Sequence, residues 1–204
     1  MSLLLNMNNI LLKNNISFKA IPIKKTSVIA KESDNSDKFV PKEVSVVKFD
    51  PNSMSDINTM KQLKNSWTES QYAYVISCKF YDKDHSIFAL TTQNDGYENI
   101  DPNNVLGLID YKISGENANL WFLETAKEFK TSIQDNNSGN ENRSIKNVGK
   151  TLFTGTVDYL KSLGIKKINL LAVPSAKQFY SKVFPSIRCR TPDEEDYSNM
   201  VLDI

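Results

Sequence analysis

The clearest chemical signal in the chain is the tripeptide Gly149-Lys150-Thr151, which stands where a polar stretch gives way to a predicted helix. The first turn of a helix has backbone N–H groups without partners, and the helix dipole makes that end positive. Both features attract anions such as phosphate groups. Lys146 and Lys150 add positive charge beside the turn. The sequence therefore predicts a site for a phosphate-sized anion at this helix start.

The same tripeptide matches the end of the nucleotide-binding pattern GxxxxGK[ST], but the rest of that pattern is missing. The pattern requires a glycine at position 144, where this chain has Ser144. It also requires a strand directly before the loop, whereas a polar stretch precedes it here. We therefore expect no nucleotide hydrolysis at this site.

The residues after the turn predict a helix, a strand and a second helix in succession. Apolar residues recur at helical spacing over 148–163, and Gly164 follows as a stop. The strand at 166–173 is almost continuously apolar, which is typical of a sheet covered on both faces. The second helix spans 175–184, and a last strand lies near 198–204.

Upstream of the polar stretch, the residue pattern predicts one helix and several strands. The helix covers 55–67, with Ser55 as its N-cap. A turn at 82–85 joins two of the strands into a hairpin and leaves His85 solvated. The strands are expected at 44–49, 72–80, 86–92, 105–113 and 118–128. This order predicts a fold of the α/β (α+β) class, with a mixed sheet and helices on both faces.

The turn before the helix at 148–163 resembles a motif of the GCN5-related N-acetyltransferases (GNAT), which use acyl-coenzyme A. In that family the pattern Q/R-x-x-G-x-G/A stands at the head of a helix and holds the coenzyme A pyrophosphate. Here Gly149 matches the last position. Asn147 replaces the first glycine, and Ser144 stands where Gln or Arg is usual.

A second stretch resembles the family segment A-x-x-F-Y-x-x-x-G-F. Ala176, Phe179 and Tyr180 match it, and Phe184 falls where the family's glycine is usual. The final residues 200–204 resemble the family's closing strand. The resemblance implies a GNAT-like domain over 42–204, with a mixed, mostly antiparallel central sheet of six to seven strands flanked by helices on both faces.

The resemblance also implies an activity and a place for the acyl donor. The activity is N-acetyl transfer, in which an amine attacks acetyl-CoA directly, without a metal ion. The strand at 118–128 would run beside the pantetheine arm and offer backbone groups of Leu123, Thr125 and Ala126. The pyrophosphate would bind at the turn and helix start, on Ser144, Lys146, Asn147, Val148, Gly149, Lys150 and Thr151.

Three side chains are candidates for proton transfer. By resemblance, Tyr180 is the acid that protonates the departing thiolate, although it also fits a core tyrosine on the apolar face of its helix. Glu124 lies mid-strand beside the expected thioester and is the candidate base, acting directly or through water, with Asp110 on the neighbouring strand as second choice. A charged residue in an apolar strand also fits an exposed sheet edge.

The acidic run Asp193-Glu194-Glu195-Asp196 precedes the last strand. Most such runs are solvated turns. In a GNAT-like architecture this connection lies near the acceptor entrance, so the run suggests a cationic amine acceptor such as a polyamine or a lysine side chain. A rival hypothesis is a catalytically impaired acyl-CoA-binding or protein-interaction domain of the same fold, because the first glycine and the Gln/Arg of the motif are missing.

Bulk properties exclude several other classes. The net charge of +1 favours no nucleic-acid partner, and no run of about 18 apolar residues is present to span a membrane. Cys78 and Cys189 lack metal-ligand spacing, so we expect reduced thiols in or near the core and no metal. Residues 1–41 are rich in Asn, Lys and Ser. They predict a loosely ordered leader of a cytoplasmic protein or, alternatively, a presequence for organelle import.

Overall fold

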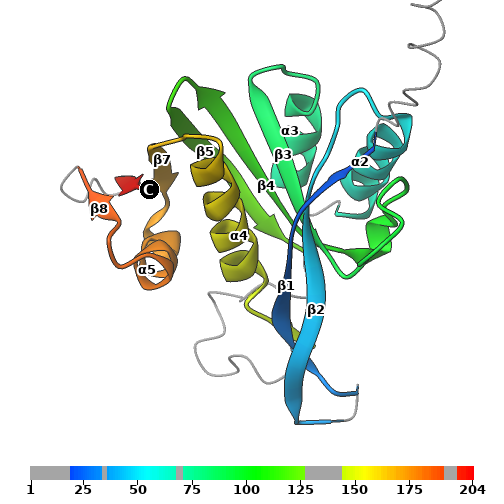
Figure 1. Ribbon diagram of the computed structural model, residues 1–204. Coiled ribbons are helices and arrows are strands. Elements are labelled where there is room, and N and C mark those ends of the chain that lie inside the picture. The colour runs from blue at the N-terminus through cyan, green and yellow to red at the C-terminus, as the bar shows by residue number, and fades with distance from the viewer. Residues whose placement is uncertain (1–18, 34–35, 68–70, 127–143, 191–196) are drawn as a thin grey trace, which may run out of the picture.

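The computed structural model of the chain describes residues 19–33, 36–67, 71–126, 144–190 and 197–204 (Figure 1). Within these residues, nine strands form one sheet in the order β6-β1-β2-β3-β4-β5-β7-β9-β8. All neighbouring strands are antiparallel except β5 and β7, which are parallel. The predicted mixed, mostly antiparallel sheet is therefore confirmed, but it has nine strands and not six to seven.

The additional strands are one long strand at the N-terminal side and two short ones. β1 (Ile21–Lys31) pairs along its length with β2 (Phe39–Lys48), so the sheet begins inside the segment expected to be a leader. Val28 and Ala30 of β1 are buried at the spacing of two that a strand requires. The surrounding lysines obscured this alternation in the sequence. Residues 1–18 lie outside the described part of the chain. The short strands are β6 (Ile145–Lys146) and β8 (Arg188–Cys189).

The region between β2 and β3 is helical. α2 (Met54–Ser66) confirms the predicted helix, but its N-cap is Ser53 and not Ser55, because the Ser53 hydroxyl accepts the Asp56 N–H at 3.2 Å. α3 (Gln71–Lys79) occupies most of the segment predicted as the first strand of a hairpin, so that prediction was wrong. Aromatic and β-branched residues favour a strand locally, but Ile76 and Phe80, four residues apart, are both buried.

The remaining elements follow the predicted order. β3 (His85–Thr91), β4 (Val105–Ser114) and β5 (Asn117–Thr125) form an antiparallel meander, with the 3₁₀ turn η1 (Pro102–Asn104) before β4. α4 (Val148–Ser162), β7 (Lys167–Ala172), α5 (Pro174–Val183) and β9 (Ser198–Asp203) confirm the expected helix, strand, helix and strand.

Helices cover both faces of the sheet, as predicted (Figure 1). α4 and α5 pack on one face, where Leu152, Phe153 and Tyr180 join the larger core. α2 and α3 pack on the other face, where Met60 and Ile76 belong to a second core. β7 departs from the prediction of a strand covered on both sides, because the side chain of Leu171 is 57% exposed.

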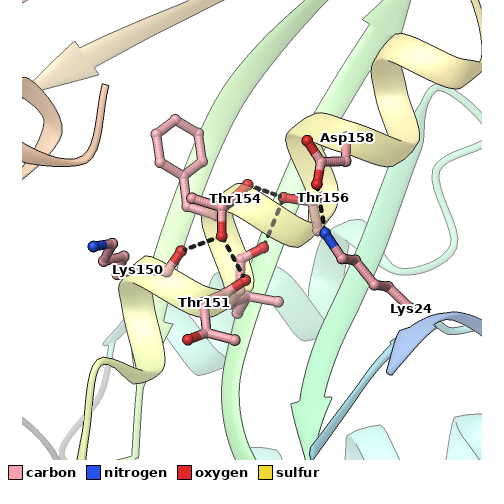
Figure 2. A network of polar contacts seen from close by, with 8 residues as sticks. Lys24, Lys150, Thr151, Thr154, Thr156 and Asp158 are labelled. Atoms are coloured by element: carbon pink, nitrogen blue, oxygen red, sulfur yellow. Dashed lines mark hydrogen bonds and ion pairs between the residues drawn. The ribbon is translucent and has the colours of Figure 1, made fainter. Parts of the chain in front are cut away.

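Three contacts hold α4 in place on the sheet. Gly155 lies so close to β2 that an added methyl group would approach Val46 Cγ2 to 2.8 Å. The hydroxyls of Tyr111 on β4 and Thr156 on α4 are hydrogen-bonded at 3.0 Å in the core. Lys24 of β1 reaches Asp158 in an ion pair of 2.6 Å, which Figure 2 shows on the outer side of the helix. These contacts fix where the first turn of α4 lies.

Candidate functional site

The sheet opens between its two parallel strands. β5 and β7 pair only from Asn117↔Lys167 to Leu120↔Leu170. Beyond this point β5 continues beside β4, and β7 continues beside β9. The register of β4 and β5 also shifts here, because Tyr111 pairs with Leu120 and Asp110 with Phe122. Trp121 is therefore an extra, bulged residue at the point where the strands separate.

A cleft of about 880 Å³ lies at this separation. On one side it reaches Ala176 and Tyr180 of α5, and on the other it reaches Trp121 and Leu171. The remaining lining comes from the strands and the residues that flank them: Asn119, Leu120, Phe122, Leu123, Asn169, Leu170, Ala172, Val173, Arg190, Tyr197, Asn199, Met200 and Val201. The exposed face of β7 that the sequence did not predict is part of this lining.

The first turn of α4 stands beside the end of β5. An added methyl group at Gly149 would lie 3.7 Å from Thr125 of β5 and 3.5 Å from the ring of Phe179 of α5. Asn147, the N-cap residue, is in the left-handed conformation with φ of 67°, and its side chain makes no capping hydrogen bond. Asn147 and Lys150 are exposed. The predicted anion site is thus an open helix start next to the cleft.

Other residues predicted for this site are used in part to hold the turn. The carbonyl of Ser144 accepts the N–H of Lys31 at 2.7 Å, and the hydroxyl of Thr151 donates weakly to the Ser27 carbonyl at 3.4 Å. Lys146 places its ammonium group 3.7 Å from the centre of the Phe39 ring. Figure 2 shows Lys150 pointing outward from the first turn of α4. Lys150 is therefore the cation best placed to meet an anion here.

The backbone N–H and C=O groups of β5 point in turn to the two neighbouring positions in the sheet, one of which β4 occupies. The N–H of Ala126 donates to the Leu106 carbonyl at 2.9 Å, so this group belongs to the β4 side. Backbone groups of successive residues in a strand point to opposite sides. Leu123 and Thr125 therefore turn theirs toward the side from which β7 has departed. Of the three residues predicted to bind pantetheine, the amides of Leu123 and Thr125 face the opening and that of Ala126 does not.

Tyr180, the predicted acid, lies on α5 at the cleft. It lines the cleft and is only 8% exposed. Its ring packs edge-to-face against Phe153 and Phe179, with centroids 5.4 and 5.1 Å apart. Burial raises the pKa of the Tyr180 phenol above its ordinary value. The phenol is therefore protonated at neutral pH. The position of Tyr180 is compatible with both interpretations, since it packs in the core and also lines the cleft.

The two acidic candidates lie elsewhere. Glu124 is 5% exposed and is not part of the cleft lining. Asp110 is fully buried, with both carboxylate oxygens 2.9 Å from Nδ1 of His85. Burial raises the pKa of Asp110, while the hydrogen bond from His85 opposes this shift. Neither carboxylate reaches the cleft directly.

The expectation that His85 is a solvated turn residue was wrong, because its imidazole is buried against Asp110. His85 is the first residue of β3, and it precedes Ile87 and Ala89 at a spacing of two. That alternation is the signal that could have placed it on the buried face.

The buried His85 also contacts Trp121, the bulged residue of β5. The rings of His85 and Trp121 are 5.3 Å apart, and the ammonium group of Lys79 lies 5.6 Å from the Trp121 ring. Phe122 adds an edge contact at 6.3 Å. Trp121 is nevertheless 47% exposed. Trp121 therefore exposes an aromatic surface to the cleft while His85 and Lys79 contact its ring. The sequence pattern did not predict this arrangement.

Other expectations concern metal, membrane and thiols. Within the described ranges, no three side chains of His, Cys, Asp or Glu gather as a metal site. None of the described helices has the length and apolar character that crossing a bilayer requires. Cys78 and Cys189 are free thiols and both are exposed, so the expectation that they lie in or near the core was wrong.

Comparison with known proteins shows which fold this is. No protein-family model matches the chain, and no curated protein matches it in sequence. Among solved structures, the ribosomal-protein-S18-alanine N-acetyltransferase of Escherichia coli matches with a TM-score of 0.51 and 13% identity, over 79% of this chain and 94% of the other. Tetrahymena GCN5 matches with a TM-score of 0.50 and 16% identity, over 74% and 89%.

A third structure, described as an acetyltransferase of the GNAT family from Desulfovibrio desulfuricans, matches with a TM-score of 0.52 and 11% identity, over 78% and 98%. At these identities the likeness concerns the fold. The chain therefore has the fold of the GCN5-related N-acetyltransferases, as the sequence motifs implied.

Proposed function

We propose that this protein is an acyl-CoA-dependent N-acyltransferase that transfers an acetyl group from acetyl-CoA to an amine. The observation that carries the proposal is the separation of β5 from β7, which opens a cleft beside the uncapped start of α4. This geometry offers an anion site and an apolar channel in the order that a long phosphorylated thioester needs. The fold it shares with N-acetyltransferases supports the same function.

The diphosphate of coenzyme A would bind at the first turn of α4. The N–H groups there have no helical partners, and the dipole of a helix of 15 residues favours negative charge at this end. Gly149 leaves room for close approach because it has no side chain, and Lys150 supplies a mobile positive charge. Val148 is buried and anchors the turn on the sheet.

The pantetheine arm would follow the open edge of β5. The backbone groups of Leu123 and Thr125 face this side and can pair with its amides. The amine nitrogen attacks the thioester carbonyl, the C–N bond forms and the C–S bond breaks. A backbone N–H near the bulge at Trp121 stabilises the oxyanion, and Tyr180 gives its proton to the departing thiolate.

The attacking amine must first lose a proton. No described residue of the cleft lining is a carboxylate or an imidazole, and Glu124 lies outside that lining. We therefore expect the acceptor to react as the free amine, with its proton released to solvent. With an aliphatic amine, kcat/KM should then rise about tenfold per pH unit below the pKa of the amine. A plateau near pH 6 to 7 would indicate a protein base instead.

Calorimetry with acetyl-CoA, followed by a thiol-release assay over a panel of amines, tests the proposal. Binding together with amine-dependent thiol release supports it. Binding without thiol release for any amine would favour the rival function, an acyl-CoA-binding domain without turnover. The replacement of the first motif glycine by Asn147 favours this rival. Absence of binding would remove both.

A further inference from the structure

The cleft carries an apolar surface on the side away from α5. Trp121, Leu171 and Tyr197 all line it, and they are 47%, 57% and 48% exposed. They come from β5, β7 and the residue just before β9, so three segments distant in the sequence converge here. Trp121 is held from behind by His85 and Lys79. A flat, immobilised aromatic surface binds apolar bodies with little loss of side-chain freedom.

Among the described lining residues, the formal charge is positive. Arg190 is the one described lining residue with a formal charge, and its guanidinium group has no carboxylate partner among the described residues. Arg188, two residues earlier on β8, is by contrast paired with Asp203. The main chain of Arg190 is fixed, because its N–H donates to the Asn199 carbonyl at 2.8 Å. The guanidinium group is therefore the one charged group that the described lining offers to a ligand.

The other polar side chains of the described lining are uncharged: they are carboxamides, tyrosine hydroxyls and an indole N–H. Asn169 donates to Asn119 at 3.2 Å across β5 and β7, one residue pair before these strands separate. A dication such as a polyamine would meet one cation and no described carboxylate on this surface. An acceptor with a carboxylate would meet a guanidinium group with matching fork geometry.

We propose that the acceptor side of the cleft selects an amine with an aromatic or large apolar body and a carboxylate, which Arg190 binds. This rests on the proposed function. The acidic run Asp193–Asp196, which lies outside the described residues, motivated the opposite expectation of a cationic acceptor. The two interpretations predict opposite orders of substrates, so one experiment separates them.

The experiment compares three acceptors at one pH, with kcat/KM corrected for the fraction of free amine. Phenylalanine has the aromatic body and the carboxylate, phenethylamine lacks the carboxylate, and spermidine is a cation without an aromatic body. We expect phenylalanine to exceed phenethylamine at least tenfold, and spermidine to be the poorest. A higher value for spermidine than for phenylalanine would overturn the inference.

Two matched pairs of variants assign the effect to residues. Arg190→Gln should lower kcat/KM for phenylalanine about tenfold and leave phenethylamine within twofold. Arg188→Gln, which removes an equal charge outside the cleft, should leave both unchanged. Leu171→Ala should lower kcat/KM for both aromatic acceptors. Leu163→Ala, at an exposed position at the end of α4, should leave both values unchanged. If Arg190→Gln leaves the ratio of kcat/KM for phenylalanine to that for phenethylamine unchanged, Arg190 does not bind the acceptor carboxylate.

Direct binding gives a readout that does not depend on turnover. The chain has two tryptophans, so Trp67→Phe leaves Trp121 as the only one. Phenylalanine should then quench the fluorescence in a saturable manner, and spermidine should not. Failure of acetyl-CoA to bind in calorimetry counts against the proposed function. Normal acetyl-CoA binding without quenching by phenylalanine counts against this inference alone.

Discussion

Gly149→Asp places a negative charge at the proposed diphosphate site, and the structure predicts that the fold will tolerate it. Gly149 has ordinary helical backbone angles, and a Cβ atom would make only van der Waals contacts of 3.5 Å with Phe179 and 3.7 Å with Thr125. A carboxylate in the first turn favours the helix by about 0.3–1 kcal/mol. Replacing a helical glycine favours it further. The melting temperature should therefore stay the same or rise.

Binding should respond in the opposite direction. A carboxylate about 5 Å from a phosphate group, at an effective dielectric constant of about 20, costs about 3 kcal/mol. At about 1.4 kcal/mol per factor of ten, this alone predicts at least a 100-fold weaker affinity for coenzyme A. Repulsion of the second phosphate and the loss of access to the free N–H groups should lower the affinity for coenzyme A further.

Calorimetry with coenzyme A, on the wild type, Gly149→Asp and the uncharged Gly149→Asn, measures this effect. Gly149→Asn has nearly the same size, so the difference between the two variants isolates the charge. Pantetheine, which lacks the diphosphate, should bind all three proteins alike. If Gly149→Asp binds coenzyme A within threefold of the wild type while remaining folded, the diphosphate does not bind at the start of α4.

Three further changes test other parts of the structure. Tyr180→Phe keeps the packing on Phe153 but removes the proton donor, so kcat should fall about 100-fold in steady-state assays while coenzyme A affinity stays within twofold. Gly155→Ala forces a methyl group to 2.8 Å from Val46, and overpacking should outweigh the gain in helix propensity and lower the free energy of unfolding by about 1–2 kcal/mol in urea titrations. Adding Val46→Ala should reduce that penalty, and strict additivity of the two changes would contradict the close packing. Burial raises the pKa of Asp56 from 3.8 to about 6, so its protonated form is the one the folded state favours. The free energy of unfolding should therefore fall by about 2 kcal/mol as the pH rises from 4 to 6.5, relative to Asp56→Asn, and a parallel pH dependence of the two proteins would refute this.

Local patterns predicted the second half of the fold well. α4, β7, α5 and β9 each appear where the spacing of apolar residues placed them, and the stop at Gly164 has the left-handed φ of 84° that favours glycine. The open helix start at 147–151 could also be inferred, because unpaired N–H groups belong to every helix start.

The side of the cleft formed by Trp121 and Leu171 could not be inferred in this way. The bulge at Trp121, the buried contact of His85 with Asp110 and the exposure of Leu171 all arise from pairing between segments distant in the sequence. Glu124 looked suitable as a base because it is charged and mid-strand, yet the register of β5 keeps it out of the cleft lining. A shift of one residue in register reverses the face of every side chain, and no local pattern specifies it.

The sequence by itself determined most of the helices and strands and the open start of α4, because these depend on periodicity and on backbone groups within one segment. Only the tertiary structure decided that β1 joins the sheet, that 71–79 is helical, and that β5 and β7 separate to form a cleft. These features depend on which distant surfaces bury each other, and their free energy exceeds the small local preferences of the residues involved.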